Sequence, residues 1–261
     1  MPGLLLINNV LKDPATLITG FTGLDILQKF EFCLNPRLSL GALWNTPVLS
    51  QQIDIDLGSA KSIGAAGIAG HNFGSYAGDN YFFRLAYSFD DITYQDAALT
   101  NLVDGNSQIV SSGSNINARY WRIRIEGNTG WNNPKRVIGY LSLGELITLD
   151  RIQAPITPPT AQPWDSETHY SERGDLISQD RYFLPLAMKL DLKNYDENFF
   201  LTNYQKFAES MLREPFFYLW NTNEPNQAVY AWIDKSINLP KFNSNYLLDW
   251  AQPINAIKRV F

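Results

Sequence analysis

The side chains that most often carry enzyme chemistry are scarce in this sequence. Its 261 residues include two histidines, His71 and His169, and one cysteine, Cys33. A nucleophilic triad needs a serine or cysteine beside an activating histidine, and neither histidine stands in such a motif or at metal-ligand spacing. His71 follows a glycine in a predicted turn, where we expect a structural hydrogen bond, and His169 is expected to meet solvent. Cys33 has apolar neighbours, which indicates a buried thiol.

Two carboxylate pairs are the remaining candidates for proton transfer. A glycosidase needs two carboxyl groups on opposite sides of a cleft. Asp54 and Asp56 alternate along a predicted strand, so both are expected on its solvent side. Asp90 and Asp91 stand in a predicted turn, where aspartate commonly bonds its own backbone. The glycine-rich segment 74–80 lacks the Lys-Ser/Thr ending of a phosphate loop. The sequence therefore predicts a protein that is not an enzyme, and a hydrolase ranks last among its functions.

Binding of a sugar is a second kind of chemistry that the residues could support. Aromatic faces stack on pyranose rings, and amide or carboxylate groups bond the hydroxyls. The candidate glycan-binding residues in the predicted loops are Phe73, Tyr76, Asp79, Asn80 and Trp131. Alternatively, these residues pack the loops or contact neighbouring subunits. Hard oxygen ligands near Asp79 and Asn80, or at Asp104, also offer a calcium site, and no other cofactor or metal is predicted.

Composition sets the broad class. Apolar residues make up 45% of the chain, charged residues 18% and aromatic residues 13%, which is typical of a globular, β-rich protein. The formal net charge is −5, whereas proteins that bind nucleic acid usually carry a basic patch. No window approaches the roughly 20 apolar residues that span a bilayer. The opening residues lack a basic leader, so no signal peptide is expected.

The elements that must position these residues are mostly strands in the first half. Period-two alternation predicts strands over 51–58, 81–88, 118–127 and 137–149, and clusters of Gly and Asn separate them. Within 118–127, Trp121, Ile123 and Ile125 are expected on one face and the intervening polar residues on the other. Many short strands between turns predict a jelly-roll β-sandwich.

The composition changes near residue 150. A proline-rich stretch, 151–175, predicts a semi-rigid linker between a first domain, 1–150, and a second domain, 176–261. Helical spacing of apolar residues predicts one helix over about 197–213 that ends before Pro215. Its start is capped either by Asn194 together with Glu197 or by Asp196 alone. The strands around it predict a small β-barrel or sandwich. The predicted fold class is mainly β: a jelly roll plus a β-rich module with one packed helix.

The order of features from Trp44 to Gly127 resembles the discoidin-like, or galactose-binding-like, jelly roll. Trp44 and Pro47 precede a strand that ends in Asp-Leu-Gly at 56–58, and the segments 68–73, 83–87 and 118–123 follow in the family's order. The resemblance implies a sandwich that binds ligands through loops at one end. Secreted family members often carry a disulfide joining the domain ends, and a chain with one cysteine cannot form it.

The second half is similar to tail-tip, baseplate or distal-tail proteins of long-tailed bacteriophages. The residues that carry this resemblance, expected in assembly or core strands, are Phe216, Phe217, Trp220, Tyr230 and Trp232. It implies a virion protein of the tail, assembled in the bacterial host cytoplasm. The implied partners are tube, hub and receptor-binding proteins, together with further copies of the chain in a homo-oligomeric ring, expected to be a hexamer.

Two functions follow as expectations. The first is a structural component of a phage tail tip that forms or decorates a ring at the distal end of the tail. The alternative is a carbohydrate-binding, lectin-like module that recognises cell-surface glycans through the loops of its first half. Neither involves nucleic acid or a membrane.

Overall fold

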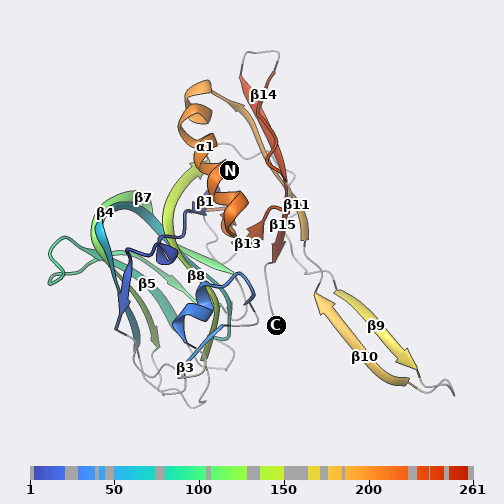
Figure 1. Ribbon diagram of the computed structural model, residues 1–261, viewed down its shortest axis with the longest axis horizontal. Coiled ribbons are helices and arrows are strands. Elements are labelled where there is room, and N and C mark those ends of the chain that lie inside the picture. Colours follow the sequence, from blue (N-terminus) through green and yellow to red (C-terminus); the bar gives the residue numbers. More distant parts are fainter. Residues whose placement is uncertain are drawn as a thin grey trace.

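The computed structural model describes residues 3–20, 29–38, 41–44, 50–73, 80–103, 107–127, 136–149, 164–170, 176–183, 186–222, 228–234, 236–243 and 247–257. This part of the chain is mainly β with one α-helix, which confirms the predicted fold class (Figure 1). Within it, backbone hydrogen bonds join thirteen strands into one connected sheet, and two further strands form a separate hairpin.

The first half forms a β-sandwich, here called the sandwich. Its strands are β2 (Leu17–Thr19), β3 (Ala42–Trp44), β4 (Ser50–His71), β5 (Tyr81–Ser88), β6 (Gln95–Asn101), β7 (Gln108–Gly127) and β8 (Arg136–Leu149), with short 3-10 turns η1 (Val10–Lys12) and η2 (Phe30–Leu34). β4 and β7 pair along most of their length, with register shifts where they bend. The first part of β4 lies in the layer of β5 through β7, and its last part pairs with β8.

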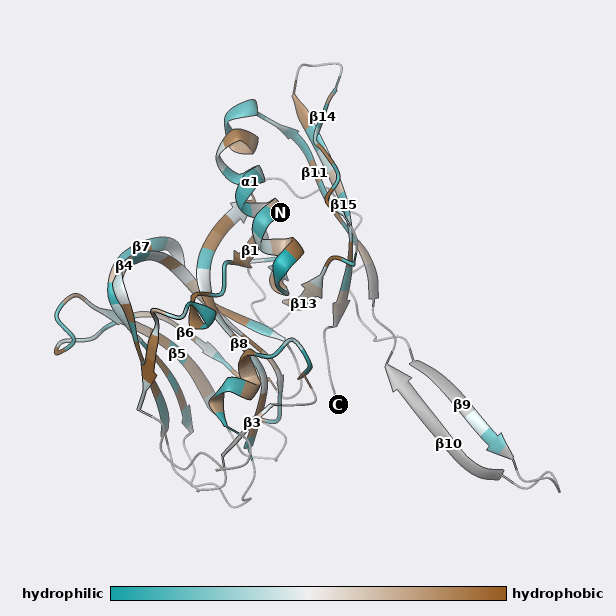
Figure 2. Cartoon of the chain, viewed as in Figure 1, coloured by the Kyte–Doolittle hydropathy of each residue, from teal (hydrophilic) through white to brown (hydrophobic). Residues whose placement is uncertain are grey.

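Alternation along these strands builds the sandwich core. On β7, Trp121, Ile123 and Ile125 are buried and the residues between them are partly exposed, as predicted. Figure 2 shows the corresponding bands of hydrophobic and hydrophilic residues along the strands. Each large apolar side chain removed from water contributes about 1.5–3 kcal/mol before conformational entropy is subtracted. Cys33 is buried within this core, which confirms the expected thiol, and burial raises its pKa.

The second unit comprises helix α1 and a sheet. Its elements are β11 (Leu186–Tyr195), α1 (Glu197–Arg213), β12 (Phe216–Leu219), β13 (Val229–Trp232), β14 (Lys241–Phe242) and β15 (Leu248–Ile257). The sheet order is β11-β15-β13-β12, and β1 (Gly3–Ile7) is next. β1 pairs with β12 on one edge and with β8 on the other, so one strand belongs to both units.

Helix α1 covers the inner face of this sheet. The Oδ1 atom of Asp196 accepts a hydrogen bond of 2.7 Å from the backbone N–H of Phe199, which caps the first turn. Phe200 and Met211 are buried against Tyr218 and Trp250. The helix ends at Arg213, before Pro215, where the missing N–H and ring of proline disfavour continuation. Among the described residues, no helix is long and apolar enough to cross a membrane.

A third buried cluster lies where the two units meet. Leu6 of β1, Tyr140 of β8 and Phe217 of β12 belong to it. Gly67 of β4 is required there, because a Cβ at this position would lie 2.5 Å from the ring of Phe217. The close approach lets an aromatic ring of the second unit pack directly on a strand of the sandwich.

A two-stranded hairpin projects away from both units. It consists of β9 (Trp164–Tyr170) and β10 (Leu176–Phe183), which pair in antiparallel register (Figure 1). β9 begins inside the stretch 151–175, so the proline-rich segment expected as a linker contains a strand, on which His169 is exposed.

Candidate functional site

Strand ends that flank four segments of the chain converge at one end of the sandwich, here called the loop end. Backbone register places Tyr81 opposite Gly127 and Ser50 opposite Glu126 in one layer. In the other layer, Trp44 lies opposite Arg136 and His71 opposite Ile138. The segments that join these ends along the sequence are 45–49, 74–79 and 128–135. Leu102, which precedes segment 104–106 in the sequence, donates its backbone N–H to the carbonyl of Tyr81 at 2.8 Å at the same end.

Arg136 and Tyr81 form a buried pair beneath the loop end. The guanidinium carbon of Arg136 lies 5.1 Å from the centroid of the Tyr81 ring, a cation–π contact. Its Nη1 atom donates a hydrogen bond of 2.9 Å to the backbone carbonyl of Asn72, and Nη2 lies 3.4 Å from the Tyr81 hydroxyl. The Oδ1 atom of Asn72 accepts a bond of 2.8 Å from the N–H of Val137. One buried cation therefore ties together the ends of β4, β5 and β8.

Aromatic packing extends this platform. The rings of Phe73 and Tyr81 meet edge to face with centroids 5.4 Å apart. A Cβ at Gly127 would lie 2.7 Å from the Tyr81 ring, so the last residue of β7 must be small. His71 is fully buried, and its Nδ1 atom accepts a hydrogen bond of 3.3 Å from the N–H of Phe73. This confirms a structural hydrogen bond at His71 and fixes the backbone that enters segment 74–79.

Several polar side chains are buried close to the loop end. Gln108 is fully buried; its Oε1 accepts from the N–H of Val103 at 2.6 Å and its Nε2 donates to the carbonyl of Asn101 at 2.7 Å. Gln51 is 2% exposed, and within the described residues neither atom of its amide has a hydrogen-bond partner. Sequence analysis missed Arg136, Gln108 and Gln51, because an isolated polar residue in a strand normally indicates a solvent-facing position.

The predicted glycan-binding residues divide into two groups. Phe73 is fully buried in the platform, so its side chain supports the site from below and is not an exposed stacking surface. Asn80 is exposed at the start of β5. Tyr76, Asp79 and Trp131 lie outside the described residues, as does Asp104 of the predicted calcium site. Their role stays a prediction.

The carboxylate pairs occupy the positions expected of non-catalytic groups. Asp56 accepts two hydrogen bonds from Arg119, at 2.7 and 2.8 Å, and these lower the Asp56 pKa. Asp54 pairs with Arg122 on the same outer face. Asp90 accepts the N–H groups of Ile92 and Thr93, both at 2.9 Å, in the turn after β5. Among the described residues, no group of three or more His, Cys, Asp or Glu side chains could hold a metal ion.

The aromatic residues predicted for assembly lie in the cores of the second unit and its junction with the sandwich. Phe216 and Trp220 are buried in the core beneath α1. Phe217 and Tyr230 belong to the buried cluster between the two units, and Trp232 is partly buried against it. Their burial explains the aromatic pattern of these strands by packing within one chain.

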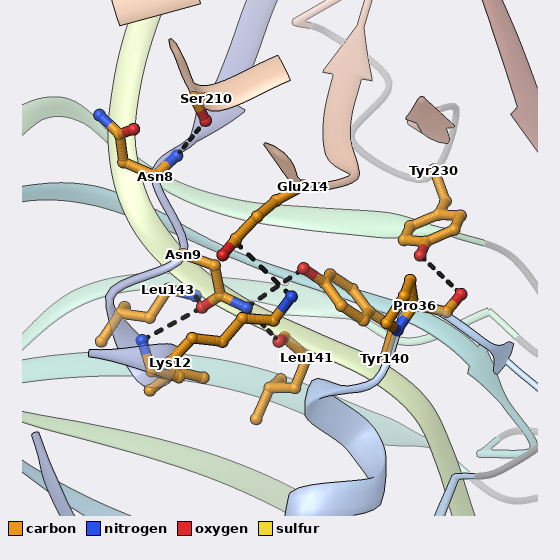
Figure 3. A network of polar contacts seen from close by, with 11 residues as sticks. Asn8, Asn9, Lys12, Pro36, Tyr140, Leu141, Leu143, Ser210, Glu214 and Tyr230 are labelled. Carbon is orange, nitrogen blue, oxygen red and sulfur yellow. Dashed lines mark hydrogen bonds and ion pairs between the residues drawn. The ribbon is translucent and has the colours of Figure 1, made fainter. Parts of the chain in front are cut away.

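A polar network also joins the two units (Figure 3). The side-chain amide of Asn9 donates a hydrogen bond of 3.0 Å to the Leu141 carbonyl and accepts one of 3.2 Å from the Leu143 N–H. These two bonds connect the start of η1 to β8. Lys12 Nζ lies 3.7 Å from Glu214 Oε2, and the N–H of Asn8 donates 2.9 Å to the hydroxyl of Ser210. Figure 3 shows these contacts. A cleft of about 310 Å³, lined by residues of α1 and η1, lies beside them. The cleft is lined by two cationic and three anionic side chains, which are Lys12, Arg213, Asp13, Glu209 and Glu214. Because both signs of charge line it, its charge favours no one class of ligand.

Comparison with solved structures covers about half of the chain. A CBM32-6 domain, CpGH89CBM32-6 from Clostridium perfringens, matches with a TM-score of 0.40 and 13% identity over 53% of this chain and 99% of that chain. CBM32-1 of a family 31 glycoside hydrolase from Clostridium perfringens matches with a TM-score of 0.41 and 15% identity, over 53% and 98%. A pectin-binding carbohydrate binding module matches with a TM-score of 0.35 and 14% identity, over 49% and 88%. No protein-family model and no curated protein matches the sequence.

The predicted β-sandwich is seen in the strand pairing of the first half itself. The expectation of a phage tail component is wrong: the structures that match are described as carbohydrate-binding modules, in line with the alternative function. The resemblance of the second half to tail-tip proteins, with its ring and tail partners, is not supported. The burial of its aromatic residues accounts for the pattern that suggested it.

Proposed function

We propose that this protein binds carbohydrate, without transforming it, through the segments at the loop end of the sandwich. The observation that carries the proposal is the convergence of the flanking strand ends on the buried Arg136–Tyr81 pair. Segments 74–79 and 128–135, which contain Tyr76 and Trp131, start and finish on this platform. Anchored ends reduce the conformational entropy that a binding segment loses when it contacts a ligand.

The residue types on these segments suit a sugar. Flat rings such as Tyr76 and Trp131 match the apolar C–H face of a pyranose, while Asp79 and Asn80 supply hydrogen-bonding groups for its hydroxyls. Asn80 is exposed beside the platform. Asp54 and Asp56 pair with arginines. Asp90 accepts backbone N–H groups and Asp91 accepts the Tyr94 hydroxyl, and these fixed roles support binding over hydrolysis.

The test is binding by the full chain. We expect specific binding on a glycan array, followed by titration calorimetry with the best-bound glycan. Trp131→Ala or Tyr76→Ala should weaken binding at least tenfold, about 1.4 kcal/mol, because truncating a stacking aromatic removes most of its contact.

A matched control uses an exposed aromatic residue far from the loop end. Phe89 is 65% exposed and follows Ser88, at the opposite end of β5 from Tyr81. Phe89→Ala should bind as the unmodified protein does. Absence of binding to any array glycan, or equal loss in all three variants, would contradict the proposal.

A further inference from the structure

A groove crosses the outer face of the second unit, on the side of the sheet away from α1. It has a volume of about 670 Å³ and is lined by β11, β15, β14 and the segment before β14. Residues 190 and 192 of β11 point into the buried core, so the alternate residues Lys189, Asp191 and Lys193 face the groove. The groove lies on the second unit and does not involve the loop end of the sandwich.

The groove carries more positive than negative charge. Its lining contains Lys189, Lys193 and Lys241 against Asp191 and Asp249, a balance of +1 in a chain whose formal charge is −5. Asp191 is shared by two ammonium groups, at 3.1 Å from Lys189 and 3.9 Å from Lys193. The groove therefore has three ammonium groups and two carboxylates, so the electrostatic potential inside it is positive.

The second carboxylate of the groove is held by neutral donors. Asp249 Oδ1 accepts the backbone N–H of Asn194 at 2.9 Å and the amide Nδ2 of Asn243 at 3.1 Å. Among the described residues, no ion pair involves Asp249 or Lys241. Asp249 is thus a positioned acceptor in the groove, and Lys241 on the neighbouring strand is an ammonium group that can take an external anion.

One wall of the groove is apolar and exposed. Leu239 is 72% exposed, although it belongs to a segment that is well anchored. The carbonyl of the preceding residue, Asn238, accepts hydrogen bonds from the Trp250 indole at 2.7 Å and from the Tyr204 hydroxyl at 3.0 Å. The exposed Leu239 side chain therefore follows a residue that the core fixes. Phe242 lies opposite Leu248, so its ring is on the α1 side of the sheet.

We propose that this groove binds an acidic oligosaccharide built from uronate units. A uronate ring carries a carboxylate for the lysines, hydroxyl donors for Asp191 and Asp249, and an apolar C–H face that can pack on Leu239. The volume of the groove lies within the range of small-ligand sites. An acidic peptide matches the lysines but offers few hydroxyl donors to the two aspartates.

The test measures binding of trigalacturonate to the full chain carrying Trp131→Ala, which weakens the site proposed on the sandwich. We expect binding that weakens as salt is added, and little binding of the uncharged methyl ester of the same trisaccharide. The triple variant Lys189→Gln, Lys193→Gln, Lys241→Gln should bind roughly tenfold more weakly, since each exposed ion pair contributes modestly and three are removed. Leu239→Ala should also weaken binding.

Two matched controls separate the groove from general surface effects. Lys29→Gln removes a charge from another exposed lysine, and Leu17→Ala truncates a leucine of the sandwich that is 62% exposed, against 72% for Leu239. Both should bind trigalacturonate as the Trp131→Ala parent does. Equal binding of the methyl ester, equal binding of a hexaglutamate peptide, or full binding by the triple lysine variant would overturn the proposal. Because every measurement uses the Trp131→Ala background, failure of the sandwich site would leave this result unaffected.

Discussion

Leu5 of β1 lies opposite Tyr218 of β12 on one edge of its strand and opposite Ile147 of β8 on the other. Its side chain is fully buried in the core of the second unit. The side chain of Leu5 thus packs in the core beneath α1, while the strand that carries it pairs with β8 of the sandwich. The two units share this strand, and the stability of both depends on it.

We therefore predict that Leu5→Ala destabilises the whole chain. The lost burial and the cavity left behind should lower the free energy of unfolding by about 2–5 kcal/mol. Denaturant unfolding followed by tryptophan fluorescence and by far-UV circular dichroism measures this change. Leu17→Ala, at a position 62% exposed on β2, is the control and should change stability by less than about 0.5 kcal/mol. A similar small effect of Leu5→Ala would contradict the shared-strand interpretation.

Arg136→Leu should loosen the loop end. The substitution keeps an apolar stem but leaves the Asn72 carbonyl and the Tyr81 hydroxyl without the guanidinium donors that they contact. We expect a loss of about 1–3 kcal/mol in unfolding free energy, together with weaker binding of any glycan that the sandwich recognises. Thermal unfolding and calorimetry measure the two effects. Arg37→Leu, at an exposed position, should leave both unchanged. Unchanged glycan affinity in Arg136→Leu would show that the platform does not support the site.

Two buried tyrosines should respond in opposite ways to loss of the hydroxyl group. Tyr230 donates a hydrogen bond of 2.9 Å to the Pro36 carbonyl, whereas the Tyr218 hydroxyl has no hydrogen-bond partner among the described residues. Tyr230→Phe should cost about 1 kcal/mol, and Tyr218→Phe should be neutral or stabilising, because an unpaired buried hydroxyl is desolvated without compensation. Denaturant midpoints of the two variants give the comparison. A larger loss in Tyr218→Phe than in Tyr230→Phe would refute it.

The turn after β5 should contribute acid sensitivity. Hydrogen bonds from the N–H groups of Thr93 and Ile92 and from the Ser88 hydroxyl lower the pKa of Asp90 from 3.8 to about 2. Because the pKa in the folded state lies below that of the unfolded state, the carboxylate stabilises the fold above pH 3.8, and this contribution disappears as the pH falls toward 2. The melting temperature of Asp90→Asn should therefore be below that of the unmodified protein at neutral pH. The difference should shrink as the pH falls through this range, and a constant difference would count against the assignment.

Local patterns predicted the elements of this fold well. The alternation of Trp121, Ile123 and Ile125 assigned the two faces of β7, because side chains on a strand alternate between faces whatever the strand pairs with. Asp196 and Pro215 similarly bounded α1, because capping and helix termination depend on residues within one turn. The fold class follows from these local rules.

Long-range relationships could not be predicted in the same way. Asn8 and Ser210 bond across 202 residues, and nothing in the segment GLLLI indicates that β12 is its partner. Arg136 is buried only because strand register brings Tyr81 and Asn72 to it, whereas arginine in a sequence usually indicates an exposed position. The sequence pattern of β12 and β13 predicts an assembly surface for the same reason. Alternating aromatic residues show that a surface is covered, and not whether the same chain covers it.

The sharing of β1 has a consequence for biosynthesis. The ribosome makes β1 before any strand of the sandwich, but β12, which covers its second edge, follows only after α1. During elongation the apolar strand GLLLI can pair with β8 while its other edge still exposes unpaired backbone groups, a template for pairing with other nascent chains. Pairing with β12 closes that edge, so resistance to aggregation depends on how quickly β12 emerges from the ribosome and folds back onto β1.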